Sequence, residues 1–522
     1  QSTENPENNT EEVTDSSAST DIQPESGEGT ADDSDETTGN TDDNSEDTAQ
    51  DKSGNMSDKE KTEDNSSDSA NQPEQEAAQA AAINLNGVMP QAAAAGTGII
   101  RRQIRHEKKV LTTAKEKAAQ YDYDGAIELL KASSDFADSQ DMQDKVVEYE
   151  QAKSELVEYP LDQVTHVFFH SMIVDTNRAF GKGAGDPTTD GLNQVMTTMS
   201  EFTQIMQSMY DKGFVLVRLH DIAYETTDEN GQAVLKKGEI LLPEGKQAFV
   251  MSQDDVCYYE YMTGQGFADR FVLDENGKIT NEYTLDDGTV IRGSFDVLTI
   301  LEDFIEAHPD FSYRGARGTI AVTGYNGIFG YRTSDYWYNW NCEYFDQQNA
   351  EERQRMYYNN ENIEADKASA KEIAAAMKEL GWTIASHSWG HIYIGSSSYG
   401  RVCWDSDMWE REVAPLVGGT DIIIFAFGED LDGWKGYAAD NEKFLYLKQK
   451  GFDYYCNVDA SSEHWIQIGA NKDYFRQARR NLDGTRMWEA VMSYTDSSYH
   501  NRLSDLFDAR DIFDPARPTP VE

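Results

Sequence analysis

The sequence predicts an α/β fold, a distorted (β/α) barrel of about seven units, for residues 159–522. From about residue 160, short apolar runs alternate with amphipathic segments, which is typical of parallel strands joined by crossover helices. Polar residues follow several of these runs directly. Because the carboxyl ends of barrel strands carry the chemistry in such folds, we expect a functional site there.

The predicted strands are short and mostly apolar. They are residues 164–170, 213–221, 248–255, 318–325, 383–387, 421–428 and 452–459. Residues 198–210, 297–309 and 368–382 are predicted as helices, because their apolar residues recur at helical spacing. In the first of these helices, Thr198 and Glu201 fit a capping box.

Residues 1–100 are predicted to be a disordered, acidic tether. Residues 1–80 contain about 24 acidic side chains, 3 lysines and no aromatic residue. Such a segment cannot bury enough apolar surface to offset the entropy of ordering it. The whole chain has a net charge of −50, which argues against nucleic-acid binding, since a phosphate backbone repels such a surface.

Residues 101–158 are rich in Ala, Lys, Glu and Leu at helical spacing and predict a small helical module. The stretch AAQYDYDGAIELLK resembles a tetratricopeptide helix–turn–helix, with Tyr121 and Tyr123 before the turn and Gly125 near it. One such unit cannot bury its own apolar face. It either packs on the following domain or acts as a spacer, and a protein partner that binds it is left open.

The four cysteines allow three pairings if all are bridged, but a chain of 522 residues does not need disulfides for its core. Free thiols are therefore at least as well supported, and a structural zinc ribbon is not expected without a Cys-x-x-Cys. No apolar run reaches the roughly 20 residues that cross a bilayer. We expect an exported protein, extracellular or on a bacterial surface. The chain begins at Gln1 without a methionine, so we also expect that a signal peptide has already been removed.

Two motifs carry the chemistry: MSQDDV, with Asp254 and Asp255, and SHSWGH, with His387 and His391. One carboxylate and two imidazoles are a common ligand set for zinc or a similar divalent ion, with a position left open for water. Gly390 would let the backbone turn between the histidines. Alone, an Asp-Asp pair is usually a solvated turn and a His-x-x-x-His is more often structural. Both motifs follow predicted strands of one array, which favours a shared metal site.

The order of these segments resembles the polysaccharide deacetylase family of carbohydrate esterases. FVMSQDDV stands at the family's Thr-Phe-Asp-Asp-Gly motif, SHSWGH at its His-x-x-x-His and FAFGED at its Arg-x-Pro-Tyr-Gly. FFHSMI and KGFVLVRLHDI resemble segments of the exported subgroup that acts on poly-N-acetylglucosamine. The resemblance covers about residues 160–470.

The resemblance implies that Asp255, His387 and His391 hold a divalent metal ion. Zn²⁺ is the expected ion, with Co²⁺, Ni²⁺ or Mn²⁺ as alternatives. The reaction implied is removal of acetyl groups from an N-acetylated or O-acetylated polysaccharide, with a metal-activated water attacking and Asp254 as base. The backbone N–H of Phe427 would help to bind the oxyanion.

The chain departs from the family pattern where the motif arginine is expected, because Ile424 stands there. Arg476, Arg479 or Arg480 could take its task, and we expect Arg476 and Arg480 at the substrate site. The family's late Leu-x-x-His, whose histidine is the usual general acid, has no clear match. His464, in DASSEHW, is the substitute we expect, and His170, which ends the first strand, is another candidate.

Aromatic side chains near the motifs suggest a sugar-binding cleft, because the apolar faces of sugars stack on such rings. Trp389, between the two histidines, and Trp434, after the FGEDL loop, are the expected cleft residues. The cluster Tyr336, Trp337, Tyr338 and Trp340 is a second candidate platform, with packing of its own loop as the alternative.

Three functions follow from these observations, and the third is an adaptor whose helical module recruits a protein partner while the barrel is a passive platform. The first is a secreted or surface metal-dependent hydrolase that deacetylates a cell-envelope or extracellular polysaccharide. The alternative is a catalytically inactive glycan-binding protein on the same fold, which the missing arginine and the missing late histidine favour.

Overall fold

The computed structural model describes residues 91–343, 358–459 and 461–521, with side chains described from residue 103 onward. The predicted acidic tether lies outside the described residues as far as residue 90. Its last ten residues form the beginning of helix α1 (Gln91–Ala119), so this helix begins earlier than the predicted boundary at residue 100. The Ala-rich composition of this stretch favours a helix, because alanine has the highest intrinsic helix propensity.

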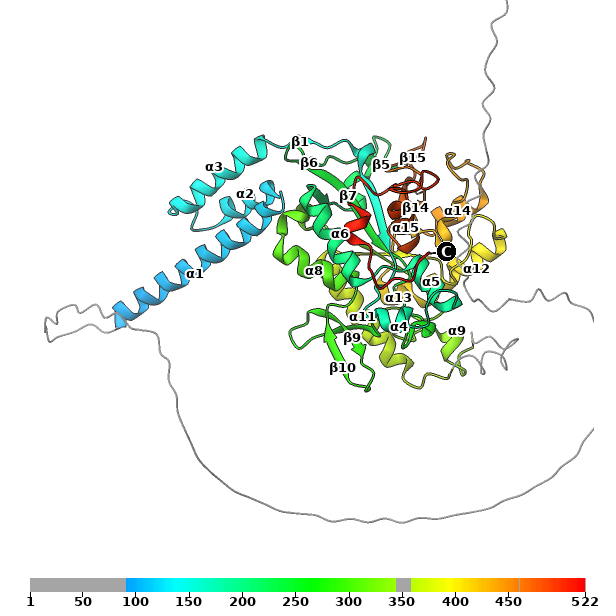
Figure 1. Cartoon of the computed structure of the whole chain (residues 1–522). Helices are drawn as coiled ribbons and strands as arrows, with labels where there is room; N and C mark the ends of the chain where they lie inside the picture. Colours follow the sequence, from blue (N-terminus) through cyan, green and yellow to red (C-terminus); the bar gives the residue numbers. More distant parts are fainter. Residues whose placement is uncertain (1–90, 344–357, 460, 522) are drawn as a thin grey trace, which may run out of the picture. The chain divides into compact units, whose positions relative to one another are not determined.

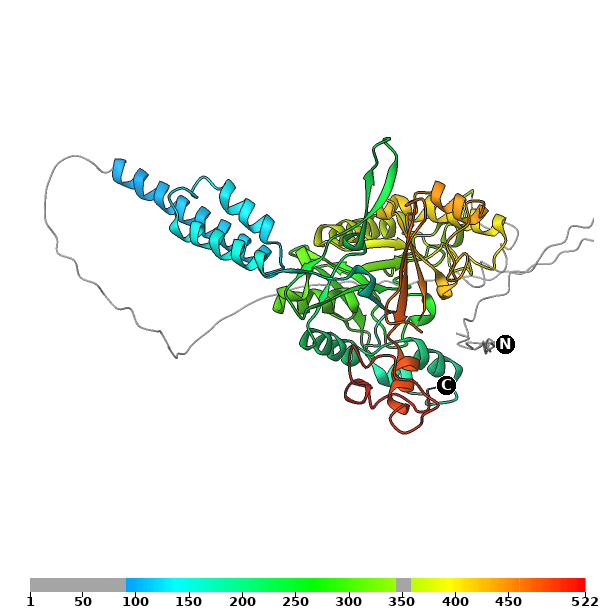
Figure 2. The same ribbon diagram turned by 90° about the horizontal axis from the view of Figure 1, so that it is seen from above.

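The helical module consists of α1, α2 (Tyr123–Ala132) and α3 (Gln140–Ser154), which lie side by side in blue and cyan in Figure 2. Its small core consists of Ala114, Ala118, Ala126, Leu130, Met142, Val146 and Tyr149. Gly125 lies in the first turn of α2 rather than in the connection before it. The hydroxyl of Tyr121 donates a hydrogen bond to the carbonyl of Asp310 at 2.9 Å, so the module contacts the segment that follows α8 (Val297–Ala307).

Seven parallel strands form a closed barrel, as the sequence predicts. In order around the barrel they are β2 (Thr165–Phe169), β7 (Gln247–Gln253), β11 (Thr319–Val322), β12 (Thr383–Ser386), β13 (Ile422–Ile424), β14 (Tyr454–Val458) and β16 (Phe475–Asn481), and β16 pairs with β2 again. A shorter strand, β3 (Phe214–Leu216), pairs with the first half of β7, while β11 pairs with its second half.

Helices surround the barrel (Figure 1). Besides α8 they are α4 (Thr176–Phe180), α5 (Pro187–Val195), α6 (Met199–Asp211), α7 (Leu219–Ile222), α9 (Asp335–Tyr338), α11 (Ile363–Leu380), α12 (Tyr399–Glu412), α13 (Ala414–Val417), α14 (Glu442–Gln449), α15 (Gly484–Met492) and α16 (Ala509–Ile512). The capping box predicted at Thr198 and Glu201 is present at the beginning of α6. Residues 217–221, predicted to continue a strand, instead form the short connection after β3 and most of α7.

Alternation along the strands divides the barrel packing into two apolar clusters. Phe249 and Met251 of β7 pack in the cluster that includes the surrounding helices, whereas Ala248 and Val250 belong to the cluster inside the barrel. Because successive side chains of a strand point to opposite faces, the same alternation places Ser252 and Asp254 on the inner side. The interior of the barrel is therefore apolar at its amino-terminal end and polar at its carboxyl end.

In the described residues, three antiparallel sheets lie outside the ring of parallel strands. They are the pair β1 (Val157–Glu158) and β6 (Leu241–Leu242), the hairpin of β4 (Ala223–Thr227) and β5 (Ala233–Lys237), and the sheet of β8 (Arg270–Leu273), β9 (Ile279–Thr284) and β10 (Val290–Gly293). A further strand, β15 (Ile466–Ile468), pairs with β16. The hydroxyl of Tyr454 donates to the carbonyl of Ala223, so the β4–β5 hairpin begins at the amino-terminal end of the barrel.

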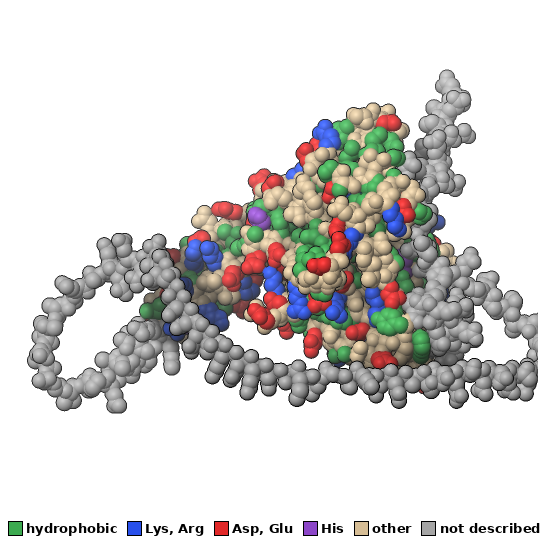
Figure 3. Space-filling view, turned by 60° about the horizontal axis from the view of Figure 1, so that its bottom comes forward, with side chains coloured by type: hydrophobic (Ala, Val, Ile, Leu, Met, Phe, Trp, Pro, Cys, Tyr) green, Lys and Arg blue, Asp and Glu red, His purple; other side chains and the backbone are tan. Residues whose placement is uncertain are grey.

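Cys257, Cys403 and Cys456 have free thiols, and Cys257 and Cys456 are buried. On the face drawn in Figure 3, acidic and basic side chains are interspersed over the described part of the molecule. Among the helices that the structure describes, none has both the length and the apolar character needed to cross a membrane.

Candidate metal centre

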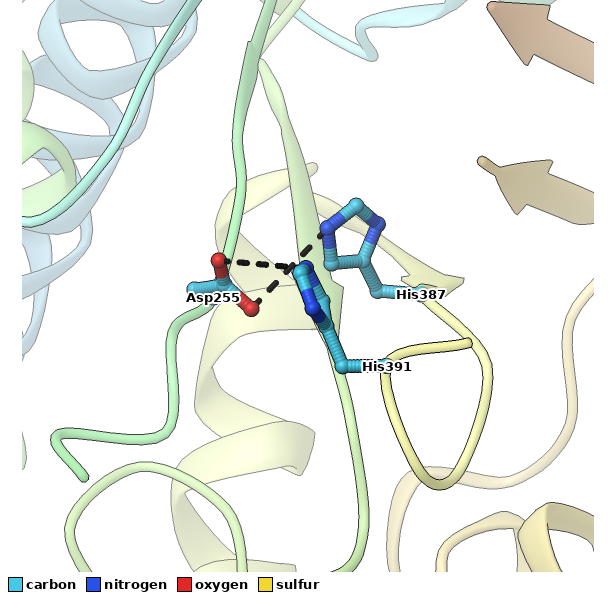
Figure 4. A group of neighbouring side chains, drawn as sticks. All are labelled: Asp255, His387 and His391. Carbon is cyan, nitrogen blue, oxygen red and sulfur yellow. Dashed lines mark ion pairs between the residues drawn. The ribbon is translucent and has the colours of Figure 1, made fainter. Parts of the chain in front are cut away.

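Asp255, His387 and His391 lie together at the carboxyl ends of β7 and β12 (Figure 4). Nε2 of His387 is 3.9 Å from Oδ1 of Asp255, and Nε2 of His391 is 3.6 Å from Oδ2 of the same carboxylate. One ligand atom from each residue lies within 4.8 Å of the other two. The two motifs that stand 132 positions apart in the sequence therefore form one cluster.

An unusual backbone conformation brings the two adjacent aspartates to the same site. In an extended strand Asp254 and Asp255 would point to opposite faces. Asp255 has a φ of 58°, in the left-handed region, which redirects its side chain. As a result, Nε2 of His387 lies 3.9 Å from both Oδ2 of Asp254 and Oδ1 of Asp255.

Further left-handed residues occur around the cluster. Ser388 has a φ of 60°, His391 of 50° and Phe427 of 57°. For residues with a Cβ such conformations cost roughly 1–3 kcal/mol each and persist only where the surroundings enforce them. These strained residues are concentrated around three potential metal ligands. This indicates a site whose conformation is enforced by its surroundings, and not a solvated turn.

The SHSWGH loop is held in place by Asp405 of α12. The Oδ1 atom of Asp405 accepts a hydrogen bond from the backbone N–H of Trp389 at 2.7 Å, and its Oδ2 atom accepts one from Gly390 at 2.8 Å. A Cβ at residue 390 would lie 2.9 Å from Oδ2 of Asp405, so a larger residue here would displace the carboxylate that holds the loop. Burial raises the pKa of Asp405 to about 6, although these hydrogen bonds and Arg401 oppose the shift.

The donor set fits a divalent metal ion. The Nδ1–H group of His387 donates to the carbonyl of Ile424 at 2.8 Å, which leaves Nε2 as the ligand atom that faces the cluster. Ligands at about 2.0–2.2 Å from one ion lie at most about 4.4 Å apart, so the distances of 3.6 Å and 3.9 Å to Asp255 are compatible with a shared ion. His387 is buried, while Asp255 and His391 keep some exposure, so the cluster is reachable from solvent.

The electrostatic surroundings keep Asp255 ionised. Burial alone would raise its pKa, but His391, His387 and His170 together with the hydroxyl of Tyr259 lower it to about 2. The Tyr259 hydroxyl donates to Oδ1 of Asp255 at 2.5 Å. Burial also lowers the pKa of His387, although Asp254 and Asp255 oppose the shift, so its imidazole is favoured in the neutral form that binds metals.

Asp254 is buried against an arginine from another strand. The Nη1 atom of Arg479, on β16, lies 2.7 Å from Oδ1 and 2.8 Å from Oδ2 of Asp254. The Arg479 guanidinium also lies 4.1 Å from the centre of the Phe168 ring. Of the three arginines considered in the sequence analysis, Arg479 is therefore the one that contacts Asp254.

A chain of hydrogen bonds inside the barrel holds the side chain of Arg479 in place. Nη1 of Arg479 donates to Oγ of Ser252 at 3.2 Å, and this Oγ lies 3.0 Å from Nε2 of His166. The other ring nitrogen of His166, Nδ1, donates to Oε1 of Gln477 at 3.1 Å. Burial, and then the charge of Arg479, lowers the pKa of His166 well below its ordinary value, so its ring is neutral and accepts from the Ser252 hydroxyl.

His170 and Phe427, two further candidates, also lie at the cluster. Nε2 of His170 is 3.9 Å from Oδ2 of Asp255, and its Nδ1–H donates to the carbonyl of Val195 at 3.1 Å. Phe427 lies in the short turn η5 (Ala426–Gly428), where its ring centre is 4.4 Å from that of His391.

The predicted aromatic cleft residues are placed differently. Trp389 is only 2% exposed, and its indole N–H donates to Oε2 of Glu412 at 2.9 Å, so it packs beneath the loop and does not line a cleft. Trp434 is 79% exposed. Of the candidate platform at 336–340, Trp337 and Tyr338 are buried, which favours the alternative of loop packing.

Three of the candidate residues are not brought to the cluster. Arg476 pairs with Asp430 at 2.5 Å, and Arg480 pairs with Asp505 at 2.8 Å. Both residues alternate with Arg479 along β16 and so point to its outer face. The side chain of His464 is exposed, and the carbonyl of the preceding Glu463 accepts a hydrogen bond from Thr165 at the beginning of β2, away from the carboxyl ends of the strands.

No model of a protein family matches this chain, and no curated protein matches it. Among solved structures, the deacetylase PplD of Streptococcus pyogenes, in complex with acetate, matches with 10% identity and a TM-score of 0.31, over 63% of this chain and 95% of its own. A Bacillus anthracis protein, BA0330, assigned as a polysaccharide deacetylase, matches with 10% identity and a TM-score of 0.33, over 67% of this chain and 70% of its own. A likeness at this level says nothing about the activity of this chain.

Proposed function

We propose that this protein is a metal-dependent deacetylase that removes acetyl groups from an N-acetylated or O-acetylated polysaccharide. The observation that carries the proposal is the convergence of Asp255, His387 and His391, whose ligand atoms lie within 4.8 Å of one another, beside the buried pair of Asp254 and Arg479. A divalent ion such as Zn²⁺ held by these three residues would polarise the acetyl carbonyl and make water more acidic.

Asp254 acts as the general base. Its carboxylate lies 3.9 Å from His387, next to the ligand set, and accepts the proton of the attacking water. Arg479 contacts both oxygens of Asp254 and so holds the carboxylate in one orientation. His170 faces Asp255 with the ring nitrogen that is not bonded to Val195, and it is the histidine best placed to return a proton to the leaving group.

The substrate class is supported by the order of motifs along the chain. FVMSQDDV, SHSWGH and FAFGED follow one another as the corresponding motifs do in polysaccharide deacetylases. The backbone N–H of Phe427, in the third of these segments and close to His391, would bind the developing oxyanion. The same geometry serves an amide or an ester, so an acetyl group on nitrogen or on oxygen is accepted at this level.

The domain organisation suggests an exported protein whose barrel acts on a glycan at a distance from the point where the chain is attached. In this proposal residues 1–100 are an acidic tether, residues 101–158 a helical spacer and residues 159–522 the catalytic barrel. A tether of like charges extends through self-repulsion, so it would let the barrel reach into a polymer layer outside a bacterial cell.

The test is release of acetate by the purified full chain. Protein incubated with Zn²⁺ or Co²⁺ is mixed with chitin oligosaccharides, acetylated xylan or peptidoglycan, and acetate is measured enzymatically. We expect acetate from at least one polymer, with rates at least 10³-fold lower in Asp254→Asn and His387→Ala. His220→Ala is the matched control, because His220 is paired with Asp421 outside the site.

Metal content distinguishes a failure of chemistry from a failure of folding. Wild type and Asp254→Asn should each retain about one ion per chain after desalting, whereas His387→Ala should not. A protein that holds no ion under these conditions, or that releases no acetate from any of the three polymers, would contradict the proposal.

A further inference from the structure

Two short series of aromatic rings lead outward from the metal centre. On one side, the hydroxyl of Tyr259 donates to Asp255, and the ring of Tyr261 is stacked on that of Tyr259, with centres 5.6 Å apart and planes at 17°. Tyr261 is 54% exposed. An exposed ring is thus linked through one buried ring to a proposed metal ligand.

The second series begins at His391. The ring of Phe427 packs against His391, and Tyr393 is stacked on Phe427 with centres 3.8 Å apart and planes at 7°. Tyr393 is 48% exposed. One exposed tyrosine is therefore connected through a second ring to Asp255, and the other is connected through Phe427 to His391.

The backing of each exposed ring matters for binding. A tyrosine has few rotatable bonds, and stacking on a second ring fixes its orientation further, so little conformational entropy is lost when a ligand covers it. Tyr259 is in turn stacked on Tyr325, with centres 5.4 Å apart, which anchors that side to the barrel. Flat, pre-oriented apolar rings with a polar tip match the faces of pyranose sugars, whose C–H groups are apolar and whose hydroxyls lie at the edge.

We propose that Tyr261 and Tyr393 are sugar-stacking platforms on the two flanks of the metal centre, so that the site binds a glycan chain across it at an internal sugar. This inference rests on the proposed function, because it takes the acetylated sugar to lie at Asp255, His387 and His391. Sugars on either side of the acetylated one then cover the two tyrosines. The site therefore selects a polymer over a monosaccharide or a small acetyl ester.

Binding is tested with the pentamer of N-acetylglucosamine as the probe and with full-length protein that carries Asp254→Asn, so that the probe is not consumed. Calorimetric titration in the presence of Zn²⁺ gives the Kd. We expect Tyr261→Ala and Tyr393→Ala each to weaken binding by about fivefold to tenfold, and the double variant to weaken it further. Tyr224→Ala is the matched control: this tyrosine is 39% exposed but lies on β4, at the other end of the barrel.

The same variants in the otherwise unchanged protein separate this inference from the proposed function. Hydrolysis of 4-nitrophenyl acetate, which carries no neighbouring sugars to stack on the tyrosines, should be unaffected in Tyr261→Ala and Tyr393→Ala, while KM for the pentamer rises. If the protein does not hydrolyse the small ester but the titrations show the expected losses of affinity, the sugar-stacking role of the tyrosines is supported and the proposed deacetylase activity is wrong. Pentamer affinities that match those of Tyr224→Ala, or no binding of the pentamer at all, would overturn the inference.

Discussion

A single nitrogen of Arg479, Nη1, lies within hydrogen-bonding distance of both carboxylate oxygens of Asp254, at 2.7 Å and 2.8 Å, and both side chains are buried. A carboxylate that is removed from water needs such a partner to stay ionised, and an ionised carboxylate is what a general base requires. The pair comes from β7 and β16, which are neighbours of β2 on its two sides. The barrel must therefore close before this base is complete.

The first prediction concerns this pair. Arg479→Gln should lower kcat by at least 100-fold with little change in KM, because the arginine orients the base and does not touch substrate. It should also lower the free energy of unfolding by about 3–5 kcal/mol, since Asp254 is left as an unpaired buried charge. Steady-state kinetics and chemical denaturation measure the two effects.

A double variant separates the two roles of Arg479. Arg479→Gln with Asp254→Asn removes both charges, so it should recover much of the lost stability while activity stays absent. Arg479→Lys keeps the charge and should keep more stability than Arg479→Gln. Full activity in Arg479→Gln, or equal stability of the single and double variants, would contradict the role given to this pair.

Much of the barrel can be predicted from sequence because its strands are short apolar runs bounded by helices of clear periodicity. Strand β16 is the exception, because its sequence, FRQARRN, contains three arginines and does not predict a buried strand. The partners that make their burial tolerable, Asp254, Asp430 and Asp505, lie elsewhere in the sequence. Only the closed barrel brings these charges together, so no local pattern could indicate them.

The site is predicted to the extent that its residues follow strands. Asp255, His387 and His391 meet as expected, because parallel strands end at one edge. Phe475 is apolar and faces the barrel interior, and alternation along a strand places Arg479 on the same face. Arg479 could therefore have been singled out, but only once β16 was recognised as a strand. The burial of Trp389 depends on Glu412, 23 positions later in the chain, and the sequence around the tryptophan gives no sign of it.

A second prediction tests the support of the histidine loop. Asp405→Ala removes the acceptor of the N–H groups of Trp389 and Gly390, so the loop that carries His387 and His391 should lose its fixed shape. Metal affinity should fall by about 10–100-fold although no ligand is changed. Competition with a chromophoric chelator measures this. Asp407→Ala, on the same helix and bonded to Tyr446 instead, is the control that should retain wild-type affinity.

The third prediction is a dependence of stability on pH that arises from Glu412. Burial raises the pKa of this carboxyl from 4.5 to about 7, although the hydrogen bonds from Ser334, Tyr336 and Trp389 oppose the shift. The folded protein therefore keeps a proton that the unfolded chain loses between pH 4.5 and 7. The contribution of Glu412 to the free energy of unfolding should fall across that window as the pH rises, by roughly 3 kcal/mol in total.

Glu412→Gln cannot titrate, so its stability relative to wild type should improve as the pH is raised from 5 to 7.5. Urea denaturation at both pH values measures the difference. Glu364→Gln is the control, because Glu364 is exposed and should show the same pH dependence as wild type. Parallel stability curves for wild type and Glu412→Gln would mean that Glu412 is ionised in the folded state across the whole range.

The last prediction concerns the attachment of the carboxyl-terminal segment. Arg517 and Glu201 form an ion pair at 2.6 Å in which neither side chain is exposed, and Arg517 also donates to the carbonyls of Asn193 and Met196. Arg517→Met should lower the free energy of unfolding by about 3–5 kcal/mol, because Glu201 remains buried without its cation. Arg510→Met removes an exposed pair with Asp508 and should change stability by less than about 1 kcal/mol. Glu201 also caps α6, so the lost stability in Arg517→Met should appear as faster hydrogen exchange at the beginning of that helix. Equal exchange in Arg517→Met and Arg510→Met would instead show that the carboxyl-terminal segment is held by its apolar contacts.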